Sequence, residues 1–301
     1  MTSQRRREII AFIALLAAGT SFSANILTAR GAAQTIPPFA LAFWRWGTLA
    51  LIVLPFAWKD LVAYRAVIRQ RWAVLFVLGA IGMGICAVTL YFAGHTTSAT
   101  NMALIATSSP ILVVIGARLF LDERMNAVQI CGVMLALLGV IIIIARGDAE
   151  TLAKIRFTTG DLWALASSVG WAVYAVMLKR EGLALPGLAL LAIGAVAGAV
   201  SMAPFLLWET FTVGPPALSL TTVGAVLMLA LVPSLLGYGL HAHATMVLGA
   251  NRAALMGYIT LVAVVALAWL VLGERLEPYH LAGGAAVLTG VWLTNRKRQT
   301  T

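Results

Sequence analysis

Charged residues are scarce in this chain. Only 11% of its 301 residues are charged, whereas a soluble domain carries roughly 25%, and 61% are hydrophobic. This composition indicates an integral membrane protein. A net charge of +10 could suggest nucleic-acid binding, but the basic residues are scattered between apolar runs, which is typical of loop charge in a membrane protein and argues against a nucleic-acid partner.

Several catalytic and energy-coupling signatures are also missing. The two cysteines, Cys86 and Cys131, both lie in apolar runs and suit neither a disulfide framework nor a metal site. No G-x-x-x-x-G-K-[ST] motif occurs, which argues against an ATP-driven pump. No Asp or Glu falls in the middle of an apolar run. An integral membrane enzyme is therefore the weaker alternative, and we expect no metal, cofactor or catalytic residue.

Long apolar runs are what the sequence has instead. A membrane-spanning helix needs about 20 apolar residues, and ten runs approach that length, so we predict an all-α protein with ten transmembrane helices. Lys and Arg of the short loops fall mostly on the side of the N-terminus, which places both termini in the cytoplasm. The predicted spans are 9–29, 38–57, 72–93, 98–120, 127–145, 160–179, 187–208, 220–243, 250–272 and 278–295.

The stretch 99–140 recurs at 250–291. In each copy a Glu-Arg pair is followed, at the same spacing, by two glycines seven residues apart. Ten spans then divide into two five-helix repeats, 9–145 and 160–295, and an odd number per repeat inverts the second relative to the first. The matching residues are Glu123, Arg124, Gly132 and Gly139 in the first copy and Glu274, Arg275, Gly283 and Gly290 in the second.

These features resemble the drug/metabolite transporter superfamily with its paired EamA units. The chain is most similar, within it, to bacterial YddG-type exporters of aromatic amino acids. The resemblance implies a secondary transporter of the bacterial cytoplasmic (inner) membrane, not an enzyme, that exports small organic metabolites such as amino acids. Transport would proceed by alternating access through a central cavity between the two repeats.

Polar and aromatic side chains at helical spacing are the candidate substrate-binding residues, because a polar group inside a span is costly unless it faces a cavity or a partner. Helix packing is the alternative for each of these faces, and Trp163 could instead be an interfacial anchor. The candidates are Asn25, Tyr91, His95, Asn101, Trp163, Trp171, Tyr174, Tyr238, His241 and Tyr258.

The aromatic members of this set favour a flat apolar substrate, although a sugar, a nucleoside or a drug-like cation would also stack on them. The expected partners are thus a small solute, with amino acids preferred, and the lipid bilayer. The sequence leaves open the exact substrate, the coupling ion, the physiological direction and the oligomeric state.

Four further features have structural or mechanistic interpretations. Arg45, between two tryptophans, is expected to extend outward to the membrane interface, with attraction of a substrate carboxylate as the alternative. The Glu-Arg pairs are expected to fix bends between spans, and the paired glycines to let helices approach closely. Pro110 and Pro233 are expected to act as hinges.

Overall fold

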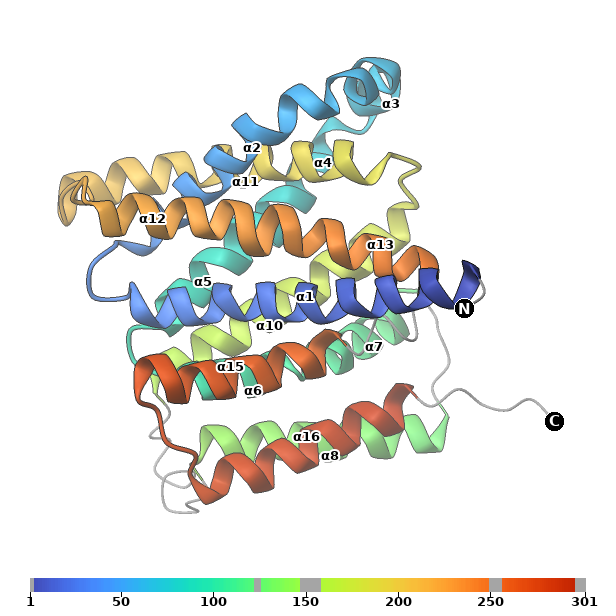
Figure 1. The fold of residues 1–301 in the computed structure, drawn as a ribbon, viewed down its shortest axis with the longest axis vertical. Helices are drawn as coiled ribbons and strands as arrows, with labels where there is room; N and C mark the ends of the chain where they lie inside the picture. The colour runs from blue at the N-terminus through green and yellow to red at the C-terminus, as the bar shows by residue number, and fades with distance from the viewer. Residues whose placement is uncertain (1–2, 122–125, 147–157, 249–255, 296–301) are drawn as a thin grey trace.

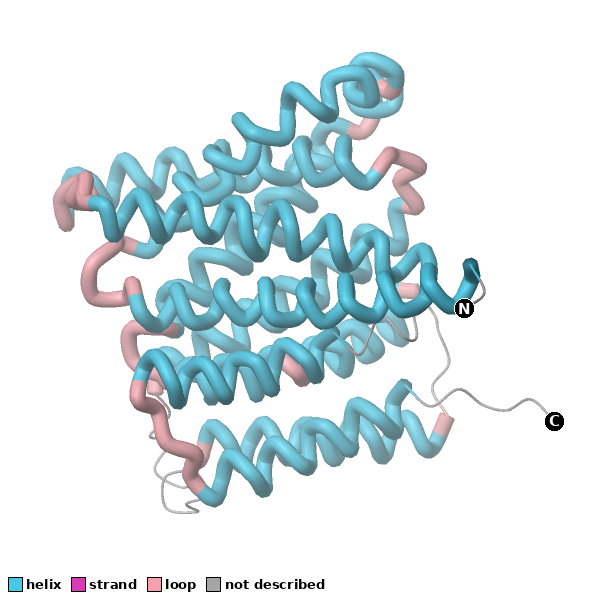
Figure 2. The backbone as a smooth tube through the Cα atoms, in the orientation of Figure 1, coloured by secondary structure: helices cyan, strands magenta, loops and turns pink. Residues whose placement is uncertain are grey.

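The structure, a computed structural model, describes residues 3–121, 126–146, 158–248 and 256–295. The described residues form helices joined by short connections, with no strand among them (Figure 2). The predicted pair Glu123-Arg124 lies outside the described residues.

Each half of the chain contributes one series of helices. Residues of the first half form α1 (Ser3–Gly31), α2 (Pro38–Ala63), α3 (Arg65–Gln70), α4 (Trp72–Gly79), η1 (Ala80–Ile85), α5 (Cys86–Ala93), α6 (Ala99–Ala106), α7 (Ser109–Phe120) and α8 (Ala127–Ile144). Residues of the second half form α10 (Thr159–Glu181), α11 (Gly187–Thr212), α12 (Leu220–Leu229), η2 (Ala230–Gly237), α13 (Tyr238–Leu248), α15 (Met256–Leu272) and α16 (Pro278–Asn295).

Seven helical segments of the described chain are long and apolar enough to cross a membrane, so this is a multi-pass membrane protein. Two shorter apolar helices, Ala127–Ile143 and Met256–Leu272, coincide with predicted spans. The predicted total of ten spans stays a prediction. The start of α1 and the end of α16 lie on the same side of the bundle in Figure 1.

Helices from the two halves pack against each other throughout the bundle. α2 packs on α11, α1 packs on α15 and α13, and α10 packs on α5 and α7. Along one edge, α8 and α16 lie side by side (Figure 1). This mutual packing buries a continuous core that includes Trp46, Tyr91 and Met102.

The paired glycines make the α8–α16 contact possible, as predicted. A Cβ atom at Gly139 would lie 2.6 Å from the carbonyl oxygen of Gly283, and one at Gly290 would lie 2.5 Å from that of Gly132. The earlier glycine of α8 contacts the later glycine of α16, and the later one of α8 contacts the earlier one of α16, so the two helices are antiparallel. The backbones are therefore too close to admit any side chain at these positions.

Gly139→Leu is expected to lower the thermal unfolding midpoint of the purified protein. Overpacking of a tight contact costs about 1–3 kcal/mol, and here the obstacle is backbone of α16 rather than a flexible side chain. Gly224→Leu is the matched control, because a Cβ atom there meets nothing within 4 Å. Equal midpoints for the two variants would contradict the close α8–α16 contact.

Two spans contain a π-helical segment at equivalent places in the repeats. η1 interrupts the span that begins with α4, and η2 interrupts the span that begins with α12. Pro233 lies inside η2 and has no backbone N–H, so the Leu229 carbonyl lacks its α-helical donor and instead accepts a hydrogen bond from Ser234 Oγ at 2.8 Å. π-Helical segments often mark functional sites in helices.

Aromatic rings of the opposite half pack on both π-helical segments. The Tyr174 ring of α10 covers Gly82 in η1, where a Cβ atom would lie 2.5 Å from it, and the Phe22 ring of α1 covers Gly237 in η2 at 3.2 Å. Pro110 is the second residue of α7, and the predicted span 98–120 is interrupted just before that helix, at Thr107 and Ser108. Whether these places act as hinges stays a prediction.

Candidate functional site

Arg45 is buried in the bundle, and the expectation that it extends to the membrane interface is wrong. The residue is 3% exposed, and Nη1 and Nε bond to side chains of three other segments. Arg45 is the seventh residue after Pro38, where α2 begins, so at 1.5 Å per residue it lies about 10 Å along that helix. Partners on neighbouring helices, rather than lipid headgroups, stabilise the guanidinium.

Both halves of the chain supply those partners. Arg45 Nη1 donates to Asn25 Oδ1 at 2.7 Å and to the Tyr91 hydroxyl at 2.8 Å, and Arg45 Nε donates to Ser234 Oγ at 2.9 Å. Asn25 belongs to α1, Tyr91 to α5, and Ser234 to η2 of the second half. The guanidinium carbon also lies 4.5 Å from the ring centroid of Trp46, a cation–π distance. We call Arg45 and these four residues the Arg45 centre.

The Arg45 centre carries a positive charge that no acid neutralises within the described part of the chain, where the ion pairs are Arg30–Glu274 and Arg71–Glu181. Its acceptors are an amide oxygen and two hydroxyls, all neutral. Burying an unpaired charge is costly, and charged groups inside membrane proteins mark functional sites by default. The sequence signal was available: Arg45 is the one basic residue within a predicted span interior.

One aromatic candidate, Tyr91, belongs to the Arg45 centre, and Tyr238 follows Ser234 by four residues, about one helical turn. The Tyr238 ring meets the Phe22 ring edge-on with centroids 5.2 Å apart. Aromatic rings at a buried cation suit a ligand with one anionic and one apolar part. The Trp171 and Tyr174 rings of α10 pair with centroids 5.3 Å apart.

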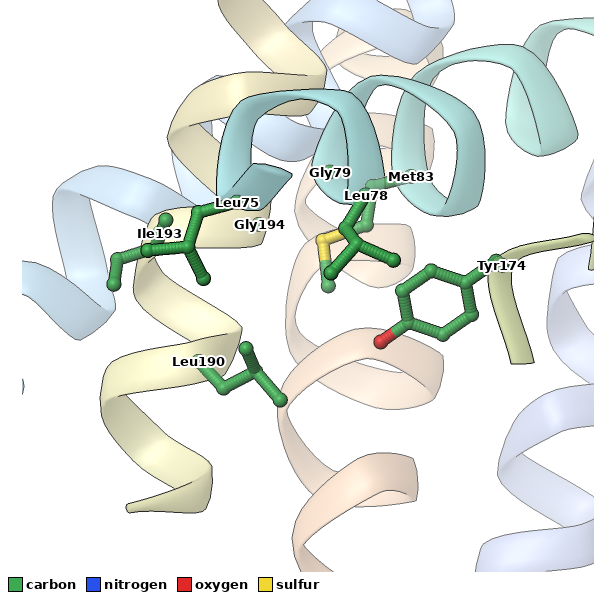
Figure 3. Close-up of a pocket in the computed structure, with 8 residues that line it drawn as sticks. All are labelled: Leu75, Leu78, Gly79, Met83, Tyr174, Leu190, Ile193 and Gly194. Atoms are coloured by element: carbon green, nitrogen blue, oxygen red, sulfur yellow. The ribbon is translucent and has the colours of Figure 1, made fainter. Parts of the chain in front are cut away.

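A small apolar pocket adjoins Tyr174. Residues of α4, η1 and α11 line it together with the Tyr174 ring (Figure 3). Figure 3 shows the Tyr174 hydroxyl pointing toward the space between Leu78 and Leu190. The lining residues are Leu75, Leu78, Gly79, Met83, Tyr174, Leu190, Ile193 and Gly194.

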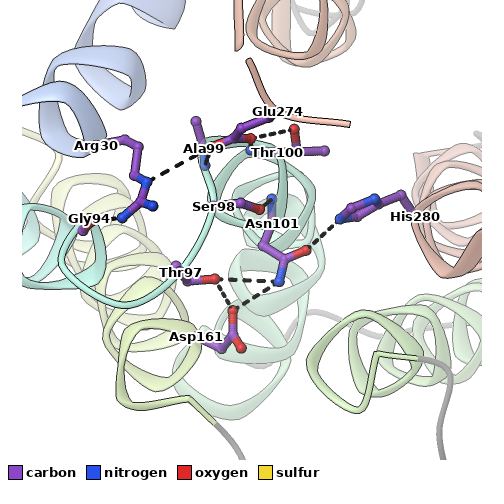
Figure 4. Close-up of polar contacts among 10 residues, drawn as sticks. All are labelled: Arg30, Gly94, Thr97, Ser98, Ala99, Thr100, Asn101, Asp161, Glu274 and His280. Carbon is purple, nitrogen blue, oxygen red and sulfur yellow. Dashed lines mark hydrogen bonds and ion pairs between the residues drawn. The ribbon is translucent and has the colours of Figure 1, made fainter. Parts of the chain in front are cut away.

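A second polar cluster joins the two halves at one end of the bundle (Figure 4). Glu274, after α15, accepts hydrogen bonds from the backbone N–H groups of Ala99 at 2.7 Å and Thr100 at 3.0 Å, so it caps the N-terminus of α6. Arg30 lies 4.0 Å from Glu274 and donates to the Gly94 carbonyl at 2.8 Å. Glu274 therefore has a structural role, as expected, but it acts through α6 and Arg30, whereas the expectation was a pair with the adjacent Arg275.

Asn101 belongs to this end cluster and not to the Arg45 centre. Its Nδ2 donates to Asp161 Oδ1 at 3.2 Å, and its Oδ1 lies 2.9 Å from His280 Nε2. Asp161 also accepts hydrogen bonds from the hydroxyls of Thr97 and Thr158. Both ends of the Asn101 amide are therefore engaged between α10 and α16, and this placement favours packing over the cavity-lining role we expected.

Glu209 makes an equivalent contact at the start of α2. Its two carboxylate oxygens accept from the backbone N–H groups of Phe39 at 3.2 Å and Ala40 at 2.8 Å. Sequence reasoning did not single out Glu209 or Asp161, because both lie at predicted span ends, where acids are common.

The remaining candidates are dispersed. Trp163 stacks on Phe92 with centroids 5.3 Å apart, next to the loop that holds His95. Burial and then the Arg30 charge lower the pKa of His95, so its ring is neutral at neutral pH, and its Nε2 has no partner in the described chain. His241 Nδ1 is likewise buried without a described partner, and Tyr258 is half-buried on α15. The structure does not gather these four around Arg45.

Comparison with known proteins identifies both halves. Residues 9–145 and 158–296 each match the EamA-like transporter family. A Bacillus subtilis protein named "Uncharacterized transporter YyaM" is 30% identical over 259 residues, which cover 84% of this chain and 83% of the relative. A Streptantibioticus cattleyicolor protein named "Probable terminal-alkyne amino-acid exporter" is 30% identical over 254 residues, which cover 83% of this chain and 82% of the relative.

Two further similarities extend over nearly the whole chain. A Salmonella typhimurium protein named "Probable amino-acid metabolite efflux pump" is 24% identical over 289 residues, which cover 94% of this chain and 93% of the relative. One solved crystal structure superposes with a TM-score of 0.59 over 97% of this chain and 96% of that one, at 20% sequence identity. At that identity the superposition supports the fold alone.

Proposed function

Because this chain belongs to the EamA-like transporter family, we propose that it is a secondary transporter that exports amino acids, including aromatic ones. It works by alternating access between two inverted five-helix repeats, 9–145 and 160–295. Ten spans cross the bacterial inner membrane, with both termini in the cytoplasm. The charge of the short loops supports this orientation, and the family supports transport rather than catalysis.

One observation carries the proposal: the Arg45 centre is built from both halves of the chain. Arg45, Asn25 and Tyr91 come from the first half and Ser234 from the second. Secondary transporters built from inverted repeats bind their solutes between the repeats, often where a helix is interrupted. Ser234 lies on η2, the interrupted part of its span.

The amino-acid class rests on two supports. Tyr91 and Tyr238 place aromatic rings at the Arg45 centre and one helical turn beyond it, which suits a solute with an aromatic ring and an anionic group. Two relatives that are 30% and 24% identical carry names that refer to amino-acid export.

Flux into proteoliposomes tests the proposal. Purified protein is reconstituted, and initial uptake rates are measured for phenylalanine, threonine, glucose, adenosine and tetraphenylphosphonium, with and without a pH gradient. The proposal predicts uptake of the two amino acids above protein-free liposomes. Uptake confined to the sugar, the nucleoside or the cation would overturn the amino-acid assignment, and the pH-gradient arm identifies proton coupling.

Trp171→Ala is expected to slow phenylalanine transport more than threonine transport. Fully burying an aromatic side chain is worth about 1.5–3 kcal/mol, so loss of a partial indole contact would weaken apparent phenylalanine affinity about tenfold. Trp171→Phe keeps a ring and should retain most of the difference between the two substrates. Equal losses for both substrates, with a lower unfolding midpoint, would assign Trp171 to helix packing.

A further inference from the structure

We infer that the Arg45 centre is a carboxylate-binding subsite, and that the protein recognises its solutes by their carboxylate and not by their ammonium group. This inference rests on the proposed transport function and narrows it to a chemical class. It favours amino acids and other organic acids over sugars, nucleosides and organic cations.

Two of the five N–H groups of the Arg45 guanidinium remain available as hydrogen-bond donors. A guanidinium carries five N–H groups, and the bonds to Asn25, Tyr91 and Ser234 use the hydrogens of Nη1 and Nε. Nη2 has no hydrogen-bond partner in the described part of the chain. A second donor nearby, Nε1 of the Trp46 ring on which the guanidinium sits, is buried and also lacks a described partner.

Charge balance points the same way. All protein acceptors of Arg45 are neutral, so the buried cation keeps its full charge. A carboxylate would neutralise it and accept a charge-assisted hydrogen bond from Nη2. The three bonds already present fix the orientation of the guanidinium, so little side-chain entropy is lost when an anion binds.

The position of the centre suits a solute and not a surface ion. Arg45 lies well inside α2, and the side chains around it come from α1, α5 and η2. Arg45 itself is 3% exposed, whereas Asn25 and Tyr238 are half-buried. Tyr238 follows Ser234 by four residues, so it brings an aromatic ring about one helical turn from the centre.

The ammonium group of an amino acid has no comparable partner. No Asp or Glu occurs in the interior of a predicted span, and the buried acids Glu209 and Asp161 are engaged in helix capping and in the end cluster. Removing the ammonium from a solute should therefore cost little binding, whereas masking the carboxylate should abolish it. 3-Phenylpropanoate is phenylalanine without its amine, and phenylalaninamide is phenylalanine without its carboxylate.

Ligand-induced shifts of the thermal unfolding midpoint of purified protein test the inference with these three probes. Phenylalanine and 3-phenylpropanoate should stabilise the wild-type protein with similar affinities, and phenylalaninamide should not stabilise it. Arg45→Gln should weaken the binding of both carboxylates at least about tenfold, as expected for loss of a charge-assisted hydrogen bond. The affinity of Arg45→Lys should lie between those of the wild type and Arg45→Gln. Arg71→Gln removes an arginine from an exposed ion pair with Glu181 and should bind as the wild type does.

Several outcomes would overturn the subsite. These are binding of phenylalaninamide as tight as that of phenylalanine, unchanged carboxylate binding in Arg45→Gln, and no stabilisation by either carboxylate. If Arg45→Gln fails to fold, binding of the three probes to the wild-type protein still tests whether the carboxylate is recognised. The transport function and the carboxylate subsite can fail independently. Equal flux of phenylalanine and phenylalaninamide would support the transport function and contradict the subsite. Carboxylate binding without flux of any solute would support the subsite and contradict the transport function.

Discussion

Asp161→Ala is expected to lower the unfolding midpoint more than any other substitution considered above, and to reduce the yield of folded protein sharply. Asp161 is 0% exposed and accepts hydrogen bonds from Thr97, Thr158 and Asn101. Thr97 and Asn101 are buried, and each buried donor left unpaired costs about 1–3 kcal/mol. The loss should therefore total roughly 2–6 kcal/mol, a range that includes the cost of breaking a buried charged pair.

Asp60→Ala is the matched control, because Asp60 lies near the end of α2 outside this cluster. Asp161→Asn keeps the shape of the side chain and one acceptor oxygen and should fall between the two. An unfolding midpoint for Asp161→Ala equal to that of Asp60→Ala would show that the cluster contributes little to stability.

A reversible covalent link across the end cluster is expected to stop transport. Thr96 Oγ1 of the first half lies 3.0 Å from Thr159 Oγ1 of the second half, so cysteines at both positions can form a disulfide. The link is made in a chain whose Cys86 and Cys131 are replaced by alanine. Alternating access requires contacts between the halves at this end to separate, so oxidation should abolish nearly all flux and a reductant should restore it.

The single Thr96→Cys chain, oxidised in the same way, controls for damage by the oxidant. A fully cross-linked protein with unchanged flux would show that Thr96 and Thr159 stay together throughout the cycle. The end cluster would then be a fixed part of the scaffold and not a gate.

The sequence predicted helix positions well because apolar periodicity and length are local properties. The predicted spans 38–57, 72–93 and 278–295 correspond to α2, to the run from α4 through η1 to α5, and to α16, and of their ends only that of α2 differs. The paired glycines were interpreted correctly because a small residue at the same place in both repeats has few other uses. The extra turns of α2 beyond residue 57 were missed because Trp58, Lys59 and Asp60 do not look like a membrane span.

The direction of Arg45 could not be predicted in the same way. Its helix allows the side chain to extend either outward or inward, and the choice depends on Asn25, Tyr91 and Ser234, which lie far away in the sequence. The same limit applies to Asn101, whose partners Asp161 and His280 come from α10 and α16. The π-helical segments were also missed, although Pro233 gave a partial signal for η2.

Counterflow tests the central claim, an alternating-access carrier for amino acids, most directly. Proteoliposomes are loaded with unlabelled phenylalanine and diluted into a trace of labelled phenylalanine, with ionophores present to remove ion gradients. A carrier exchanges bound solute across the membrane, so the account predicts transient accumulation of label above equilibrium, suppressed when the loaded solute is glucose. Label that only equilibrates, equally with either solute inside, would contradict the account and indicate a channel or no transport of phenylalanine.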